Sequence, residues 1–150
     1  MKPREAINTI LEKALEVLKE DKFHASGLFV FKEKIECIVV FEVKDPDSNY
    51  RSMLAAGRKV AYLHPQCVAF VREAWGSRMI SPKGKTAYDM PDREECLMIT
   101  AQNKEGETAS AVIPFSRFVG EIVLGVIDKT NYSESNLLDA FWDGVREGGR

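Results

Sequence analysis

Apolar side chains recur along the chain with two different periods, and the change of period divides it into predicted helices and strands. A return every three or four residues is typical of a helix that buries one face, and it predicts helices over residues 5–20, 50–64 and 135–147. The stripe of the first helix is formed by Ile7, Ile10, Leu11, Ala14, Leu15 and Leu18. Such a stripe stabilises a helix only when it packs on another element, so each helix is expected to lie on a sheet.

The other apolar runs are short and bounded by turn residues, and they predict β-strands. They cover residues 27–31, 35–43, 67–75, 96–102, 108–115 and 118–127. Tight turns are expected at residues 32–34 and 116–117, and a glycine-containing hairpin loop at residues 103–107. The order α-β-β-α-β-β-β-β-α favours an α+β fold, with a mainly antiparallel sheet of five or six strands and three packed helices. A single domain over residues 1–150 is expected.

The second predicted strand differs on its two faces. One face carries the apolar residues Ile35, Cys37, Val39, Phe41 and Val43. The other face is polar at both ends and apolar at its centre, where Ile38 and Val40 lie. This pattern is typical of a strand that a helix covers only in part.

Composition and charge argue against several classes of partner. The formal net charge is −2, with 29% charged and 45% apolar residues, so no strong field attracts nucleic acid or an anionic membrane. No apolar run approaches the roughly 20 residues that span a bilayer, and no signal-peptide core is present. Three cysteines, Cys37, Cys67 and Cys96, lie in apolar runs, which indicates reduced thiols and a cytoplasmic location.

The strand predicted over residues 67–75 is taken as the centre of the sheet, and it ends in charged residues. Its first five residues are apolar, whereas Arg72 and Glu73 point to opposite faces by the period of two. The simpler interpretation is that both charges are solvated where the sheet meets water. The alternative is that one of them lines a cleft bounded by Trp75 and the loop beyond.

Residues 76–94 form the longest irregular segment of the chain. Loops longer than about 12–15 residues in compact domains are usually functional or disordered. This one contains four basic residues, among them Arg78 and Arg93, which could hold an anion beside Trp75. A mobile polar loop is the simpler interpretation. The candidate ligand-binding residues are Arg72, Glu73, Trp75, Arg78 and Arg93.

No sequence motif for catalysis, metal binding or a cofactor is present: HExxH, paired CxxC, GxSxG, P-loop and GxGxxG are all missing. His64 and Cys67 are close in sequence, but a metal would need two further ligands nearby. A nucleophilic thiol would need an exposed Cys67 with a lowered pKa, whereas its neighbours are apolar. The sequence therefore predicts no catalytic residue, no metal and no cofactor.

The element order helix–hairpin–helix–meander–helix resembles that of roadblock and profilin-like modules. This resemblance concerns the order alone and implies no residue roles. The residues Arg72-Glu73-Ala74-Trp75, together with Arg93-Glu94-Glu95 before the next strand, are similar to those of uncharacterised prokaryotic proteins over the middle of the chain. That resemblance implies no activity.

Two classes of function remain open. The first is a non-catalytic interaction or regulatory module that forms a homodimer or binds another protein. The second is an enzyme or small-ligand (anion) binder that uses the cleft between Trp75 and the 76–94 loop. A dimer is favoured by Gly57, which permits close approach along the second helix, and by Pro114, which indicates that the strand at residues 108–115 is an edge or carries a bulge. Alternatively, Gly57 faces the chain's own sheet and Pro114 keeps the edge monomeric.

Overall fold

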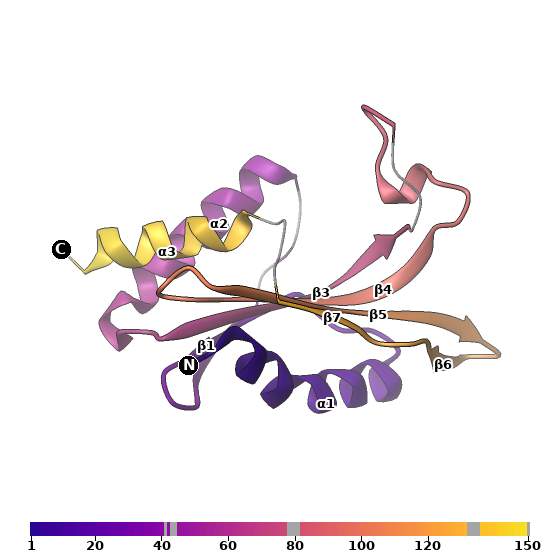
Figure 1. Ribbon diagram of the computed structural model, residues 1–150, viewed down its shortest axis with the longest axis horizontal. Helices are drawn as coiled ribbons and strands as arrows, with labels where there is room; N and C mark the ends of the chain where they lie inside the picture. Colours follow the sequence, from indigo (N-terminus) through magenta and orange to yellow (C-terminus); the bar gives the residue numbers. More distant parts are fainter. Residues whose placement is uncertain (41, 43–44, 78–81, 132–135, 150) are drawn as a thin grey trace.

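The chain folds into one antiparallel sheet with helices on both faces (Figure 1). A computed structural model describes residues 1–40, 42, 45–77, 82–131 and 136–149. The helices are α1 (Pro3–Asp21), α2 (Pro46–Val60) and α3 (Leu137–Gly148), with 3-10 helices η1 (Ala61–Leu63) and η2 (Ala87–Asp89). The strands are β1 (Gly27–Phe31), β2 (Ile35–Val40), β3 (Cys67–Gly76), β4 (Glu94–Asn103), β5 (Thr108–Phe118), β6 (Glu121–Leu124) and β7 (Asp128–Thr130). The predicted α+β class is confirmed.

The strands follow the order β2-β1-β3-β4-β5-β6, and β7 pairs with the first half of β5. Every pair is antiparallel. The longest ladder joins β3 and β4, from Cys67 opposite Asn103 to Gly76 opposite Glu94. The predicted central strand therefore lies inside the sheet, and the long loop after it connects two neighbouring strands and projects from the body of the molecule (Figure 1).

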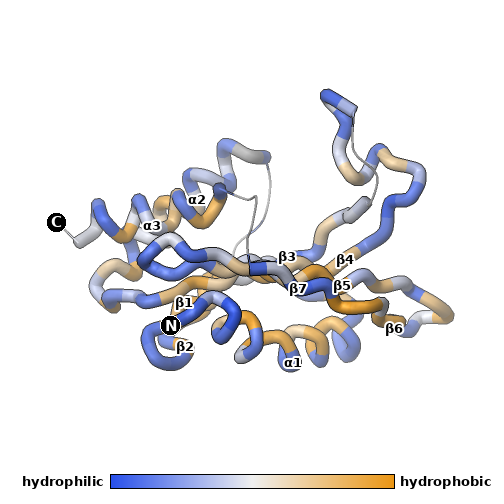
Figure 2. The backbone as a smooth tube through the Cα atoms, in the orientation of Figure 1, coloured by the Kyte–Doolittle hydropathy of each residue, from blue (hydrophilic) through white to orange (hydrophobic). Residues whose placement is uncertain are grey.

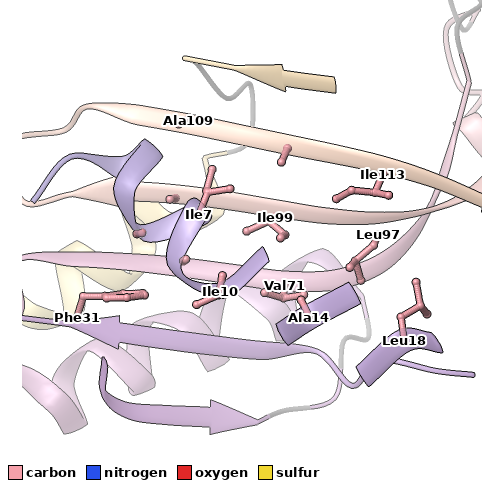
Figure 3. Packing of buried hydrophobic residues seen from close by; sticks show 14 of the residues in the cluster. Ile7, Ile10, Ala14, Leu18, Phe31, Val71, Leu97, Ile99, Ala109 and Ile113 are labelled. Carbon is pink, nitrogen blue, oxygen red and sulfur yellow. The ribbon is translucent and has the colours of Figure 1, made fainter. Parts of the chain in front are cut away.

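Helix α1 lies on one face of the sheet with its predicted stripe inward. Figure 3 shows Ile7, Ile10 and Leu18 pointing toward side chains of the sheet such as Val71 and Ile99. Figure 2 shows the same pattern: along α1, hydrophobic residues lie on the side of the helix that faces the sheet, and hydrophilic residues lie on the other side. The helix packs mainly on β3, β4 and β5. It therefore covers the middle of this face and leaves β1 and β2 to one side.

The opposite face is covered by α2 and α3, which approach each other very closely. A Cβ atom added to Gly57 of α2 would lie 2.0 Å from the carbonyl oxygen of Phe141, and one added to Gly144 of α3 would lie 2.1 Å from that of Leu54. No side chain fits at such distances, so the contact requires glycine on both helices. Close packing at Gly57 is confirmed, but its partner is α3 of the same chain rather than a second subunit.

Helix α2 begins earlier than the apolar period predicts, at Pro46 rather than near Tyr50. The side chain of Asp45 accepts a hydrogen bond of 2.9 Å from the backbone N–H of Ser48, which caps the helix. Proline is well suited to the first helical turn because it lacks the N–H that would be unpaired there. The cap predicted for the last helix, at residues 133–135, lies outside the described residues.

The end of β5 also differs from the prediction. The strand continues to Phe118, and the turn to β6 lies at Val119 and Gly120, with φ of 52° and 78°, rather than at residues 116–117. The predicted strand 118–127 is shortened to β6, which pairs with the end of β5, and the additional strand β7 follows it and pairs with the first half of β5. Residues 108–115 are therefore not an edge, and the other alternative holds: two residues of β5, 113 and 114, stand opposite three, 125–127, so the pairing is irregular at Pro114. Pro114 lies between the two paired stretches, and its carbonyl accepts a hydrogen bond from Gly125.

Strand β2 contains a β-bulge near its start. Val30 of β1 pairs with Cys37, but Phe31 pairs with Ile35, so that Glu36 has no residue opposite it. The extra residue turns Ile35 to the α1 side of the sheet. Alternation alone had placed Ile35 on the face of Cys37, and that prediction is wrong. Cys37 and Val39 pack beneath α2 and α3, while Phe41 and Val43 lie outside the described residues.

Candidate functional site

The charged end of β3 does not gather the predicted residues into one pocket. Glu73 and Trp75 lie on the α1 side of the sheet, and Arg72 lies on the opposite face, across from Met98. Arg78 lies outside the described residues. The period of two therefore separates Arg72 from Glu73, as the sequence predicts, and any cleft on the α1 side is built without Arg72.

Glu73 takes part in an ion-pair cluster that links three strands. Arg117 contacts the carboxylates of Glu73 at 3.3 Å and Glu95 at 3.2 Å, and it donates a hydrogen bond of 2.6 Å to the carbonyl of Lys22. Burial raises the pKa of the Glu73 carboxyl above its usual range, Arg117 opposes that shift, and Glu95 adds to it. Because Lys22 follows α1 directly, the cluster fastens the C-terminal end of the helix to the sheet. Glu73 therefore has a structural role, because it contacts the arginine that attaches α1 to the sheet.

Trp75 forms an aromatic and cationic cluster with the long loop. Its ring meets the ring of Tyr88 edge to face, with centroids 5.3 Å apart. The guanidinium carbon of Arg93 lies 4.7 Å from the Tyr88 ring centroid and 5.7 Å from that of Trp75. Arg93 also donates a hydrogen bond of 3.2 Å to the Tyr88 carbonyl. The structure thus brings together two of the five candidate residues, Trp75 and Arg93, and adds Tyr88.

The described part of the loop contains its own local structure. Thr86 and Asp89 form a capping box around η2, with a backbone hydrogen bond of 2.8 Å from Thr86 to the Asp89 carboxylate. These hydrogen bonds hold the pKa of Asp89 below its usual range. Ser77 donates a hydrogen bond to Asp92 across the base of the loop. These contacts hold Tyr88 and Arg93 beside Trp75.

The thiols are not suited to nucleophilic chemistry. Cys67 has no exposed surface, and burial raises the pKa of its thiol to about 12; burial likewise raises the pKa of Cys96 to about 11. Both groups are therefore protonated at neutral pH, which removes the thiolate that a nucleophile or a metal ligand requires. Among the described residues no group of three or more His, Cys, Asp or Glu side chains could hold a metal ion.

An open groove that the sequence analysis did not predict lies between α1 and the outer strands β1 and β2. Its volume is about 590 Å³. Its apolar lining includes Phe23, Phe29, Ile35, Ile38 and Val40. The exposed fractions of Phe23, Ile38 and Val40 are 56%, 53% and 66%. The polar residues Thr9, Lys13, Asp21 and His24 come from α1 and the turn after it. The groove is a largely apolar concave surface open to solvent.

Three local features produce this groove. Helix α1 packs on β3, β4 and β5 and so does not cover the two outer strands. Gly27 contributes no side chain to the lining. The β-bulge at Glu36 turns Ile35 to the groove side, next to Ile38. One feature of the sequence could have predicted this groove. The strand predicted at residues 35–43 has a face that is polar at both ends, but Ile38 and Val40 make the centre of that face apolar.

Other exposed apolar side chains gather at the far edge of the sheet. Phe118 and Val119 are 70% and 86% exposed, and Val123 of β6 is 50% exposed. Phe118 and Val119 stand at the tight β5–β6 turn. By contrast, the residues beside α1 line one continuous concave surface on a six-residue edge strand. This concavity makes the groove the better candidate for binding.

Comparison with known proteins identifies a family. A protein-family model described as bacteriophage lambda protein ea47 matches residues 1–142. No curated protein and no solved structure matches the chain. The resemblance to roadblock and profilin-like modules therefore extends no further than element order, while a bacteriophage family agrees with the prokaryotic resemblance. No helix in the described residues is long and apolar enough to cross a membrane.

Proposed function

The chain belongs to the family of bacteriophage lambda protein ea47, and we propose that it is a non-catalytic interaction module whose contact surface is the groove between α1, β1 and β2. The observation that carries this proposal is the half-exposed apolar lining of the groove, with Ile38 and Val40 on an edge strand. Contiguous exposed apolar surfaces on soluble proteins mark interaction sites. A groove bordered by an edge strand suits an extended or helical segment of a partner protein.

The free energy available from apolar burial indicates how strongly the groove alone could bind a partner. Full burial of a Val, Ile or Phe side chain stabilises by about 1.5–3 kcal/mol. The four side chains Phe23, Ile35, Ile38 and Val40 are about half exposed, so their burial contributes roughly 3–6 kcal/mol together. A micromolar complex needs about 8 kcal/mol net. The binding free energy therefore needs a second contribution besides apolar burial. Main-chain hydrogen bonds to the outer edge of β2, which pairs with β1 alone in the part of the chain that the structure describes, can provide it.

The polar residues support a non-catalytic role. Glu73 is held by Arg117, Arg93 lies against two aromatic rings, and the thiols of Cys67 and Cys96 carry raised pKa values. General acid–base catalysis works best when a group titrates near the operating pH and stands free to reach a substrate. The Glu73 carboxylate and the thiols of Cys67 and Cys96 are not free in this way.

Site-specific photo-crosslinking tests the proposal in bacterial cells that express the full chain. A photoreactive phenylalanine analogue replaces Ile38 in one variant and Val123 in another. The two positions form a matched pair, since both lie on edge strands and are 53% and 50% exposed. Protein adducts are expected from position 38 and not from position 123. Absence of adducts at position 38, or equal yields at both positions, would contradict the proposal.

A second candidate function, small-anion binding, is favoured by the Trp75 cluster. Trp75 and Tyr88 are 43% and 52% exposed, and the Arg93 guanidinium lies beside both rings. Such a group could receive a flat anionic molecule by stacking and charge. The test is a thermal melt with millimolar inorganic phosphate or a nucleoside monophosphate. Binding raises the melting temperature of the native chain, and Arg93→Ala removes the rise.

A further inference from the structure

We propose that a small open hollow between α3 and the β4–β5 turn is a binding site for a small neutral ligand with an amide group. The volume of this hollow is about 250 Å³. Its lining includes Gln102 and Asn103 at the end of β4, and Trp142 and Arg146 of α3. Gln102 pairs with Val68, whose side chain packs beneath α2 and α3. The hollow therefore lies on the opposite face of the sheet from the groove, and the inference goes beyond the proposed interaction function.

Two buried polar groups of the lining have no hydrogen-bond partner among the described residues. They are the indole N–H of Trp142 and the side-chain carbonyl oxygen Oε1 of Gln102. Trp142 is 6% exposed and Gln102 is 8% exposed. Nearly all buried polar groups in native proteins are paired, because an unpaired group loses its hydrogen bonds to water and gains none in return. A partner that the described side chains do not supply is therefore expected at both atoms.

The surroundings of both groups hold them in place. The Nε2 amide of Gln102 donates a hydrogen bond of 3.0 Å to a carboxylate oxygen of Asp139. A carboxylate only accepts hydrogen bonds, so the amide end of Gln102 must face Asp139 and its carbonyl oxygen must point elsewhere. The ring of Trp142 meets the ring of the fully buried Phe141 edge to face, with centroids 5.2 Å apart. Neither group can turn toward water without losing one of these contacts.

The two unpaired atoms ask for a ligand with one acceptor and one donor. The indole N–H of Trp142 only donates hydrogen bonds, and the carbonyl oxygen of Gln102 only accepts them. A carboxylate has no donor for Gln102, and an ammonium group has no acceptor for Trp142. An amide offers a carbonyl oxygen and an N–H on neighbouring atoms, so it can pair with both groups at once.

The charges and the size of the hollow favour a small neutral ligand. Its lining contains two basic residues, Lys104 and Arg146, and two acidic residues, Asp139 and Asp143. Arg146 forms an ion pair with Asp143, and Asp139 accepts the hydrogen bond from Gln102. The volume of about 250 Å³ is several times the roughly 30 Å³ of a water molecule in the liquid. It is also below the roughly 300 Å³ at which sites for drug-sized ligands begin.

A ligand reaches the two atoms only when a side chain of the lining moves, because both atoms are covered in the structure. The side chains of Arg146 and Asp143 are 62% and 46% exposed, and exposed rotamers exchange within picoseconds to nanoseconds. By contrast, α3 is held against α2 through Gly57 and Gly144. We therefore expect a ligand to displace the exposed side chains and to leave the helix in place.

The chain contains two tryptophans, so a nitrogen-edited NMR spectrum shows two indole N–H signals. Trp75→Phe removes one of them and thereby assigns both. Butyramide, butyrate and 1-butanol are titrated at millimolar concentrations into the full chain labelled with nitrogen-15. Butyramide should move the Trp142 signal to lower field in a saturable way, because hydrogen bonding shifts an N–H proton in that direction. Trp75 is 43% exposed and lies outside the hollow, so its signal should stay in place.

The other two probes and one pair of variants test the chemistry of the site. Butyrate has no donor and 1-butanol has a single polar atom, so both should bind about tenfold more weakly than butyramide. Gln102→Met removes the carbonyl oxygen and should also weaken butyramide about tenfold. Gln66→Met is the control, because Gln66 does not line the hollow. Circular-dichroism melts check that both variants are folded, and the comparison of the three probes needs no variant.

Three results would overturn the proposal. If butyramide leaves the Trp142 signal in place, no amide binds in the hollow and water alone fills it. If all three probes shift the signal equally, the hollow recognises apolar chains rather than an amide. If the Trp142 signal of Gln102→Met moves to higher field without any probe, the two groups bond to each other and the site has no free donor or acceptor. None of these results bears on the groove, which photo-crosslinking tests separately.

Discussion

The two faces of the sheet are covered in different ways. On one face α2 and α3 pack against each other through Gly57 and Gly144, and together they close over a core that includes Leu28, Phe70 and Phe141. On the other face α1 lies alone and packs mainly on β3, β4 and β5 (Figure 1). Strands β1 and β2 are thus shielded on the α2–α3 side and open on the α1 side.

Simple dimensions explain the difference. Neighbouring strands lie about 4.8 Å apart, so the six strands of the main order extend over roughly 24 Å. A helix with its side chains is about 10–12 Å across and covers two or three strands. A single helix therefore leaves part of the face bare, and in this protein the bare part is a groove of about 590 Å³ beside an edge strand. The comparison teaches that the open surface follows from the number of helices on each face.

The largest expected effect comes from the close contact of α2 and α3. Gly144→Val would place a side chain within 2.1 Å of the Leu54 carbonyl oxygen, so the helices must separate. We expect a loss of about 4 kcal/mol or more in the free energy of unfolding, measured by urea denaturation. Gly149→Ala in the C-cap of the same helix is the control, because its Cβ meets an atom at an ordinary 3.4 Å. Equal stability of both variants would contradict the close packing.

Truncation of two phenylalanines compares the covered and open faces. Phe70 is 2% exposed beneath α2 and α3, and Phe70→Ala is expected to lower the free energy of unfolding by about 3–5 kcal/mol. Phe29, on the neighbouring strand, faces the groove and is only partly buried. Phe29→Ala should lose about half as much, since less apolar surface returns to water. Similar losses in urea denaturation would show that the groove is closed in solution.

Alkaline pH should weaken the part of the core that α1 covers. Burial raises the pKa of Cys67 to about 12 from its ordinary value near 9. Above pH 9 the unfolded chain releases this proton and the native chain keeps it, so the free energy of unfolding falls with rising pH. The loss amounts to about 1.4 kcal/mol at pH 10. In urea denaturation, the free energy of unfolding of Cys67→Ala should fall less at alkaline pH than that of the native chain. The free energy of unfolding of Cys37→Ala should fall about as much as that of the native chain.

The smallest effect concerns the attachment of α1 to the sheet. Arg117 is partly exposed, so its ion pairs with Glu73 and Glu95 are screened by solvent. Arg117→Gln should therefore lower the free energy of unfolding by about 1 kcal/mol or less. A double-mutant cycle with Glu95→Gln measures the coupling of that pair. Zero coupling would show that the pair is not formed in solution.

The candidate site was only partly visible in the sequence. The period of two separated Arg72 from Glu73, and the loop was recognised as the segment that would meet Trp75. The structure places Arg93 beside that ring, 5.7 Å from its centroid. Arg117 could not be connected to Glu73 from sequence, because the two lie 44 residues apart and meet only through the registers of β3, β4 and β5.

The apolar periods determined the helices, the strands and the stripe of α1, because each depends on neighbours within one or two turns along the chain. The turn of Ile35 into the groove, the partner of Gly57 and the internal position of β5 were decided by the tertiary structure. Strand order and register join residues that are distant in sequence, and a local period carries no information about them. The groove has the same origin, since it exists because one helix is narrower than the sheet on which it lies.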